Sequence, residues 1–453
     1  MLSGFAQPTS VHGVHQSASL IPAEVKEILL RGVAALESVP DDEKDWHPGS
    51  NGQVLDLVHP SLYCLRIGKS KILHNVGVEG GATVKDYTVD DYLACRPDFE
   101  GSDSKIISGD YQWLPTDFSI SEAGDVECKG YINNLHPITH RQLYPAITSV
   151  LQRFVPMFER VLSDALSPEP PLVIQVDPLH WYEHLGEPDY EDDEAYERWY
   201  ATREPLIPDA PPFEPPSNEG RINVDLRGST VQVIVKLANI VLTPENPTYP
   251  GGSWHVEGML NERIVATGLY YYSCENITES RLAFRVQVGT DPDGFGMKYE
   301  QNDNKGYERA FGFSNEDPLN QELGHIVAAE DKCVAFPNIY QHRVEPFELA
   351  DPTRPGHRKI LCFFLVDPKN KVDSTSVIPP QQREWYEAEM RRIPALRALP
   401  TELYDMIAAY VFDGTITREE AEADRARLME ERKEFVLGLN EDVFEVAFSL
   451  CEH

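Results

Sequence analysis

The stretch QVIVKLANIVLTPENPTYPGGSWHVEG at residues 232–258 decides the fold, because it joins a long β-branched run to a turn-rich loop and a His-x-Glu pair. Four more short β-branched or aromatic runs follow, separated by Pro, Gly, Asn and Asp turns: RIVATGLYYYS, RLAFRVQV, KCVAFPN and RKILCFFLVD. Short strands at this density indicate a β-sandwich or jelly roll rather than alternating βαβ units. No G-x-G-x-x-G or P-loop motif follows any of them, so a nucleotide-binding fold has no support.

Helical patterns precede this strand-rich core. Residues 23–38 place apolar side chains at helical spacing and end before Pro40, and a second helical stretch covers residues 140–166. We expect Pro145 and Pro156 to bound or kink the second helix, because proline costs a helix interior about 3 kcal/mol.

The C-terminal region turns helical again after two consecutive prolines. Thr417, with Glu420 three residues on, forms a capping box for a charged helix that reaches about Val436. These patterns predict an α+β protein with a mostly β core, a double-stranded β-helix (jelly roll), and helical N- and C-terminal regions. The expected organisation is a helix-rich region at 1–170, an acidic, proline-rich excursion at 182–220, the core at 222–370 and a C-terminal helical region at 376–453.

The chain is strongly acidic: 74 Asp and Glu against 40 Lys and Arg give a formal charge of −34 in 453 residues. Such a charge repels phosphate backbones and anionic lipids, so we expect no nucleic acid and no membrane as partner. The 7 cysteines occur singly, which favours reduced thiols over a disulfide framework or zinc knuckle. With no secretory signal and no run of about 20 apolar residues, we expect a cytoplasmic protein, monomeric or homodimeric.

The candidate chemistry lies in the strand-rich region. Side chains alternate in extended backbone, so His255 and Glu257 point to one side and can reach one metal ion together. His342 follows a predicted strand, and Arg358 opens the next apolar strand. Two imidazoles and a carboxylate are the donor set suited to non-heme Fe(II), with positions left open for a bidentate co-substrate and oxygen. The plainer readings are a buried, hydrogen-bonded imidazole for His342 and a surface cation for Arg358.

The order His-x-Glu, a later His and then an Arg at the start of the following strand resembles the Fe(II)/2-oxoglutarate-dependent oxygenases. A closer likeness covers most of the chain. YINNLHP at 131–137, the stretch at 232–258 and HRKILCFFLVDP at 357–368 look like a large fungal family of jelly-roll oxygenase-like proteins, long of unassigned function.

The resemblance implies that His255, Glu257 and His342 bind iron and that Arg358 pairs with the distal carboxylate of 2-oxoglutarate, with O2 as oxidant. The sequence departs from the family pattern in two ways. The acidic ligand is Glu rather than the commoner Asp, and Arg358 follows His342 by sixteen residues, with an apparent loop insertion between them.

The implied reaction is oxidation of an unactivated C–H bond by hydroxylation, desaturation or oxidative C–N ring closure. The resemblance favours a small amino acid or natural-product intermediate as substrate. Four residues on the strands before and after the His-x-Glu loop are candidates for the substrate pocket: Lys236, Asn239, Tyr270 and Tyr272. An ordinary structural role on the face of a strand explains each of them at least equally well.

Two other classes of function are compatible with the sequence. One is a non-catalytic jelly-roll binding protein, in which the triad is a relic. The other is a zinc hydrolase, because His180-Trp-Tyr-Glu-His184 matches the H-x-x-E-H pattern. That chemistry needs both histidines on one helical face, and the Leu-Gly-Glu-Pro that follows leaves little room for a helix.

Overall fold

A computed structural model gives the structure of the chain, and it describes residues 6–74, 81–96, 106–168, 176–189, 191–209, 211–212, 218–288, 298–312, 314–318 and 320–451. The chain divides into two compact units, each treated separately below. The first contains Met1–Leu166, Ile222–Phe284 and Gly324–Val436; the second contains Ser167–Arg221, Arg285–Leu323 and Leu437–His453.

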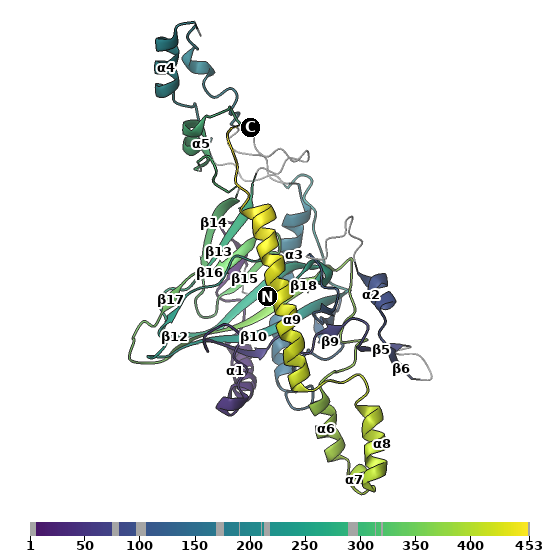
Figure 1. The fold of residues 1–453 in the computed structure, drawn as a ribbon. Helices are drawn as coiled ribbons and strands as arrows, with labels where there is room; N and C mark the ends of the chain where they lie inside the picture. The colour runs from purple at the N-terminus through teal and green to yellow at the C-terminus, as the bar shows by residue number, and fades with distance from the viewer. Residues whose placement is uncertain are drawn as a thin grey trace. The chain divides into compact units, whose positions relative to one another are not determined.

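A nine-stranded sheet forms the centre of the first unit (Figure 1). Its order is β1-β2-β15-β12-β18-β10-β8-β9, with β3 paired to β10, and its described pairings are antiparallel. The β-branched runs of the sequence supply its long central strands. The strands are β1 (Gln7–Pro8), β2 (His15–Ser17), β3 (Val54–Val58), β8 (Thr116–Ile120), β9 (Val126–Cys128), β10 (Thr230–Leu242), β12 (Ile264–Glu275), β15 (Cys333–Pro337) and β18 (Gly356–Val366).

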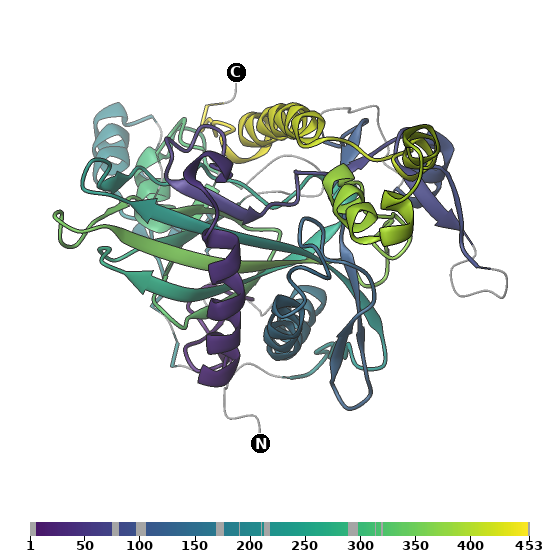
Figure 2. The same ribbon diagram turned by 90° about the horizontal axis from the view of Figure 1, so that it is seen from below.

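Two helices, α1 (Ala23–Glu37) and α3 (Leu143–Leu166), cover one face of this sheet (Figure 2). Both match the predicted helical stretches. Pro145 is the third residue of α3, close to its start, whereas Pro156 lies inside the helix and does not end it. Phe154 and Phe158, on either side of the proline, are fully buried in the main hydrophobic core. Burial of such aromatic side chains is worth about 1.5–3 kcal/mol each, which offsets the cost of proline in the helix.

The opposite face of the sheet carries polar side chains. In the antiparallel register Lys236 lies opposite Cys362, Ile240 opposite Arg358, and Ala238 opposite Asp56. Because residues two apart share a face, Lys236, Arg358, Cys362 and Asp56 all point away from the helices α1 and α3. The functional residues discussed below lie on this side.

Helix α9 (Arg418–Leu439) lies over this polar face (Figure 2). The predicted capping box is confirmed: Glu420 donates its backbone N–H to the Thr417 hydroxyl at 3.2 Å, and Thr417 N–H donates to the Glu420 carboxylate at 2.8 Å. Further along α9, the Arg432 guanidinium stacks over the Trp113 ring at 3.7 Å. That ring in turn stacks on Phe364 of β18, with centroids 5.7 Å apart.

Smaller sheets and helices complete the first unit. A three-stranded sheet has the order β14-β13-β16, and three two-stranded sheets pair β11 with β17, β4 with β7, and β5 with β6. Their bounds are β4 (Leu65–Arg66), β5 (Lys71–His74), β6 (Thr83–Asp86), β7 (Tyr111–Gln112), β11 (Thr248–Tyr249), β13 (Arg281–Gln287), β14 (Asn320–Val327), β16 (Gln341–Val344) and β17 (Phe347–Glu348). The remaining helices are η1 (Asp41–Glu43), α2 (Val89–Cys95), η3 (Leu260–Glu262), α6 (Arg383–Arg392), α7 (Pro394–Arg397) and α8 (Thr401–Val411). The divide between the units falls within β13, β14 and α9.

The second unit holds η2 (Glu183–Leu185), α4 (Asp193–Thr202), α5 (Asn304–Phe311) and η4 (Asn440–Phe444). The acidic stretch 182–220 falls here and contains α4; residues 190, 210 and 213–217 of it lie outside the described part of the chain. The protein is therefore a mixed α/β protein with mostly antiparallel sheets, and its described strands close no barrel. Among the described helices, none has the length and apolar character needed to cross a membrane.

Candidate metal centre

The His-x-Glu pair lies in an extended loop between β11 and η3. Gly251, with φ +90°, starts this loop, and a Cβ there would lie 2.8 Å from the Val344 carbonyl oxygen of β16. The close approach lets the loop pair with β16: His255 N–H donates to His342 O at 3.2 Å, and His342 N–H donates to His255 O at 2.9 Å. This two-residue bridge brings the imidazoles together, with ring centroids 4.4 Å apart.

Glu257 completes the group. Its Oε1 lies 3.3 Å from Nε2 of His342 and 3.9 Å from Nε2 of His255. The three side chains each offer one ligand atom, and these atoms lie within 4.8 Å of one another. His255 donates its Nδ1–H to the Ser253 carbonyl oxygen at 2.8 Å, which leaves Nε2 as the metal-binding nitrogen. The donor set and its geometry therefore fit a divalent transition metal.

The protonation states also suit a metal. Desolvation and the neighbouring His342 ring lower the pKa of His255 to about 4, so its imidazole is neutral at neutral pH. Desolvation opposes ionisation of Glu257, but the hydrogen bond from His342 and the charges around it lower the pKa of Glu257 to about 2. A neutral imidazole and an ionised carboxylate are the forms that bind metal, so neither must lose a proton first.

Neighbouring side chains hold the ligands in place. Asn338 accepts the Glu257 N–H at 2.8 Å and donates to the Glu257 carbonyl oxygen at 2.9 Å, so one amide clamps the loop at the ligand itself. The His342 ring packs against Phe336 and Phe284, at centroid distances of 4.8 and 6.5 Å. Side-chain exposure falls from 35% at His255 to 5% at His342, so the group opens on the His255 side.

Arg358 is a buried cation, with only 1% of the residue exposed. Its guanidinium donates to the Ser280 hydroxyl at 2.5 Å and lies between the rings of Tyr271 and Phe347, at 5.4 and 5.3 Å. Its Nε has no hydrogen-bond partner among the described residues. The interpretation of Arg358 as a surface cation is therefore wrong, because its guanidinium is buried.

The four pocket candidates divide between the two faces of the sheet. Lys236 lies on the polar face, and its ammonium is close enough to Glu257 to help lower the pKa of that carboxyl. Asn239 donates to Glu37 of α1 at 2.6 Å and accepts from the Tyr272 hydroxyl at 3.3 Å. Tyr270 and Tyr272 lie in the main hydrophobic core. Of the four, only Lys236 is brought to the side that carries the metal ligands.

The H-x-x-E-H motif forms no comparable group. His180 is bonded to Asp177 at 3.0 Å, and its side chain is 58% exposed. Glu183 and His184 lie in the short 3-10 helix η2, which is too short to place both histidines on one helical face. Within the described ranges, neither histidine belongs to a group of three metal-ligating side chains.

Three residues of this region have roles that the sequence patterns did not predict. Ser280 bonds Arg358, Asn338 clamps Glu257, and Glu262 accepts three hydrogen bonds behind the ligand loop. Asn338 stands in the Phe336-Pro-Asn run that precedes His342, so its position was a usable signal. Ser280 and Glu262 carry no such signal, because Arg358 is 78 residues from Ser280, and Trp113 and Arg432 are 149 and 170 residues from Glu262.

Comparison with known proteins adds a family match. A family model described as "Protein of unknown function (DUF4246)" matches residues 5–389. None of the curated proteins matches the sequence.

Three solved structures align with parts of the chain. They are IDO from Bacillus thuringiensis (9% identity, TM-score 0.20, 30% of this chain and 46% of that one), the Fe(II)/(alpha)ketoglutarate-dependent dioxygenase TqaL (12%, 0.27, 59% and 71%) and a bsmA homolog from Methylobium petroleophilum PM1 (11%, 0.18, 32% and 45%). The aligned part thus spans about half the length of the first of these chains. At such scores these likenesses carry no argument about this chain.

Proposed function

We propose that this chain, which belongs to the DUF4246 family of proteins of unknown function, is an Fe(II)/2-oxoglutarate-dependent oxygenase. The proposal includes a double-stranded β-helix core, in which the polar face of the main sheet and the sheet β14-β13-β16 enclose the site. One observation carries it: a His-Glu-His group, whose ligand atoms lie within 4.8 Å of one another, lies on the side of the sheet that also buries an arginine with no carboxylate partner among the described residues.

His255, Glu257 and His342 would hold the iron. Ferrous iron with 2-oxoglutarate and O2 supplies the oxidation of an unactivated C–H bond, with succinate and carbon dioxide as the other products. The three protein ligands leave coordination positions free for the co-substrate, as in other sites with two histidines and one carboxylate.

Arg358 and Ser280 would bind the distal carboxylate of 2-oxoglutarate. The guanidinium fork remains charged and can make two parallel hydrogen bonds to a carboxylate. The Ser280 hydroxyl already accepts from Arg358, so its own hydrogen is free to donate to the same carboxylate. A co-substrate anion would thereby neutralise a buried guanidinium that forms no ion pair with the residues that the structure describes.

The substrate we propose is a small amino acid or natural-product intermediate that enters on the exposed side of His255. The Phe284 and Phe336 rings pack against His342 at the closed side and keep water from that part of the site. The outcome would be hydroxylation, desaturation or ring closure, according to which C–H bond the pocket holds near the metal.

Anaerobic addition of Fe(II) and 2-oxoglutarate to the purified chain tests the proposal. We expect a visible charge-transfer band, and succinate release once O2 is admitted. Glu257→Ala should abolish both, whereas the control His325→Ala, at an exposed histidine of β14, should retain both. Iron bound at one equivalent with neither a band nor succinate would refute the oxygenase and leave a non-catalytic binding protein.

A further inference from the structure

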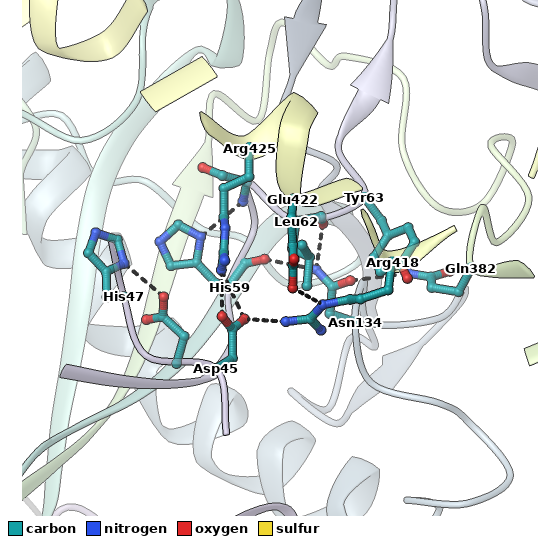
Figure 3. A network of polar contacts seen from close by, with 12 residues as sticks. Asp45, His47, His59, Leu62, Tyr63, Asn134, Gln382, Arg418, Glu422 and Arg425 are labelled. Carbon is teal, nitrogen blue, oxygen red and sulfur yellow. Dashed lines mark hydrogen bonds and ion pairs between the residues drawn. The ribbon is translucent and has the colours of Figure 1, made fainter. Parts of the chain in front are cut away.

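A second group of two histidines and one carboxylate lies on the N-terminal part of the first unit. His47 precedes β3, Asp56 lies on β3, and His59 follows it. Each offers one ligand atom, and these atoms lie within 4.8 Å of one another. Figure 3 shows the two imidazoles side by side, and their centroids are 5.1 Å apart. The donor set is the same kind as in the His255 group, but no residue is shared.

The carboxylate of this group is buried and only half satisfied. The Asp56 side chain has 0% exposure, and one of its oxygens accepts from His47 Nδ1 at 2.7 Å. The other oxygen, Oδ1, is buried with no hydrogen-bond partner in the part of the chain that the structure describes. Burial of a carboxylate oxygen without a hydrogen-bond partner costs free energy. A metal ion, or a water bound to one, would provide the missing partner.

The group opens onto a cleft. This cleft has a volume of about 230 Å³, and its lining includes Asp56, His59, Asp45, Tyr63 and Trp385. Two cations lie near the group: Lys236 acts on Asp56 and His59 through its charge, and Arg425 is matched by Asp45, with both carboxylate oxygens within 2.9 Å of its Nη1 (Figure 3). The charge of Arg425 is therefore compensated. A divalent ion could reach the group from solvent through the cleft.

We propose that His47, Asp56 and His59 form a second metal site, for a divalent ion of the zinc type. Two imidazole nitrogens and one carboxylate oxygen match the ligand preference of Zn²⁺, and three protein ligands leave a coordination position toward the cleft. The ion would tie together the loop before β3, the strand itself and the turn after it. The site is independent of the proposed oxygenase function, because it uses none of its residues.

One contact sets the expected strength of this site. His59 Nδ1 accepts the backbone N–H of Ser61 at 3.2 Å, which places the ring proton of the neutral imidazole on Nε2. Binding of a metal through Nε2 displaces that proton and breaks this long hydrogen bond. The second site should therefore bind a given ion more weakly than the His255 group, where the hydrogen bond given up, from His342 Nε2 to Glu257 at 3.3 Å, joins two of the ligands themselves.

Anaerobic titration of the metal-free, full-length chain with Co²⁺ tests the proposal, because Co²⁺ replaces Zn²⁺ and absorbs visibly. We expect two equivalents, the second at least tenfold weaker. His47→Ala should remove the weaker equivalent and Glu257→Ala the tighter one. His47 is suited to replacement because its side chain is 25% exposed. The matched control is His140→Ala, a cleft histidine outside the group, which should retain both equivalents.

Some outcomes would overturn the proposal. A wild-type chain that binds one equivalent, with the same titration curve in His47→Ala, has no second site. If His47→Ala is poorly folded by circular dichroism, Asp56→Asn is the second variant, since it retains the shape of the side chain while removing its charge. If Asp56→Asn binds both equivalents with the same titration curve as the wild type, the site is also refuted. Loss of the tighter equivalent alone in Glu257→Ala separates this test from that of the oxygenase.

Discussion

Replacement of Glu262 by Gln should weaken the structure behind the ligand loop. Glu262 is 1% exposed; its Oε1 accepts from Trp113 N–H at 3.0 Å and from Arg432 Nη2 at 2.6 Å, while Oε2 accepts from Met259 N–H at 2.6 Å. Gln has only one acceptor oxygen for these three N–H donors. Its NH2 group would face at least one of them, donor against donor. The change also removes the carboxylate that forms an ion pair with the buried Arg432 at 2.6 Å.

The expected loss can be estimated from these contacts. A hydrogen bond to a charged group contributes about 1.5–3 kcal/mol, and removal of one partner from a buried ion pair costs about 3–5 kcal/mol. These figures describe overlapping interactions, so we expect Glu262→Gln to lower the free energy of unfolding by about 3–5 kcal/mol in total. Met259 follows Glu257 by two residues, so iron affinity should fall as well.

Urea unfolding followed by tryptophan fluorescence measures this loss. The control is Glu430→Gln, the same chemical change on α9, where the Glu430–Lys433 pair is exposed and its loss should change stability by less than about 1 kcal/mol. In the double variant Glu262→Gln/Arg432→Met the stranded cation is gone, so the loss should be smaller than the sum of the two single losses. An unfolding midpoint equal to that of Glu430→Gln, or strict additivity in the double variant, would refute the reasoning.

Three further changes test other parts of the structure. Gly268→Ala places a Cβ 2.8 Å from Phe154 and 2.9 Å from Phe158, so urea unfolding should show a loss of about 1–3 kcal/mol; an unchanged midpoint would contradict the tight packing of α3 on β12. Arg358→Lys keeps the charge but loses the fork, so 2-oxoglutarate should bind about tenfold more weakly or worse, with iron content unchanged; equal binding would argue against this anchor. Desolvation raises the pKa of Asp373, so the folded chain favours the protonated carboxyl. The stability that this carboxyl gives the fold is therefore lost as pH rises through its folded pKa. Asp373→Asn should therefore unfold like the wild type in acid and become relatively more stable as pH rises in urea melts, and a constant difference at every pH would contradict this.

Sequence patterns predicted the elements better than their assembly. β-Branched runs predicted the central strands, helical periodicity predicted α1 and α3, and a capping box predicted α9, because these patterns depend on neighbours along the chain. Alternation also places Lys236 and Asn239 on opposite faces of β10. Helices α1 and α3 cover the face of β10 that carries Asn239, which leaves the other face for the metal ligands. This choice depends on tertiary packing, which alternation along the strand does not encode.

The metal ligands show the same limit. His255 and Glu257 are two apart, so extended backbone alone puts them on one side, and the following strand pattern pointed to His342. His47, Asp56 and His59 have no such spacing: they are gathered by a loop that folds back on β3, where Trp46 bridges Leu55. Sequence spacing identified His255 and Glu257 as a pair, and it missed the second group, which depends on a chain reversal.

Lys236 connects the two groups electrostatically. Its ammonium helps lower the pKa of Glu257 and that of Asp56, so it lies within reach of both carboxylates. The same cation opposes the binding of any metal ion at either group, and Lys236→Met removes it. In a titration with Co²⁺ alone, both equivalents should therefore bind more tightly in Lys236→Met than in the wild type, while Lys236→Arg, which retains the charge, should leave both unchanged. Tightening at one equivalent only would show that the lysine acts on a single group, and the two sites would then be separate compartments rather than parts of one polar face.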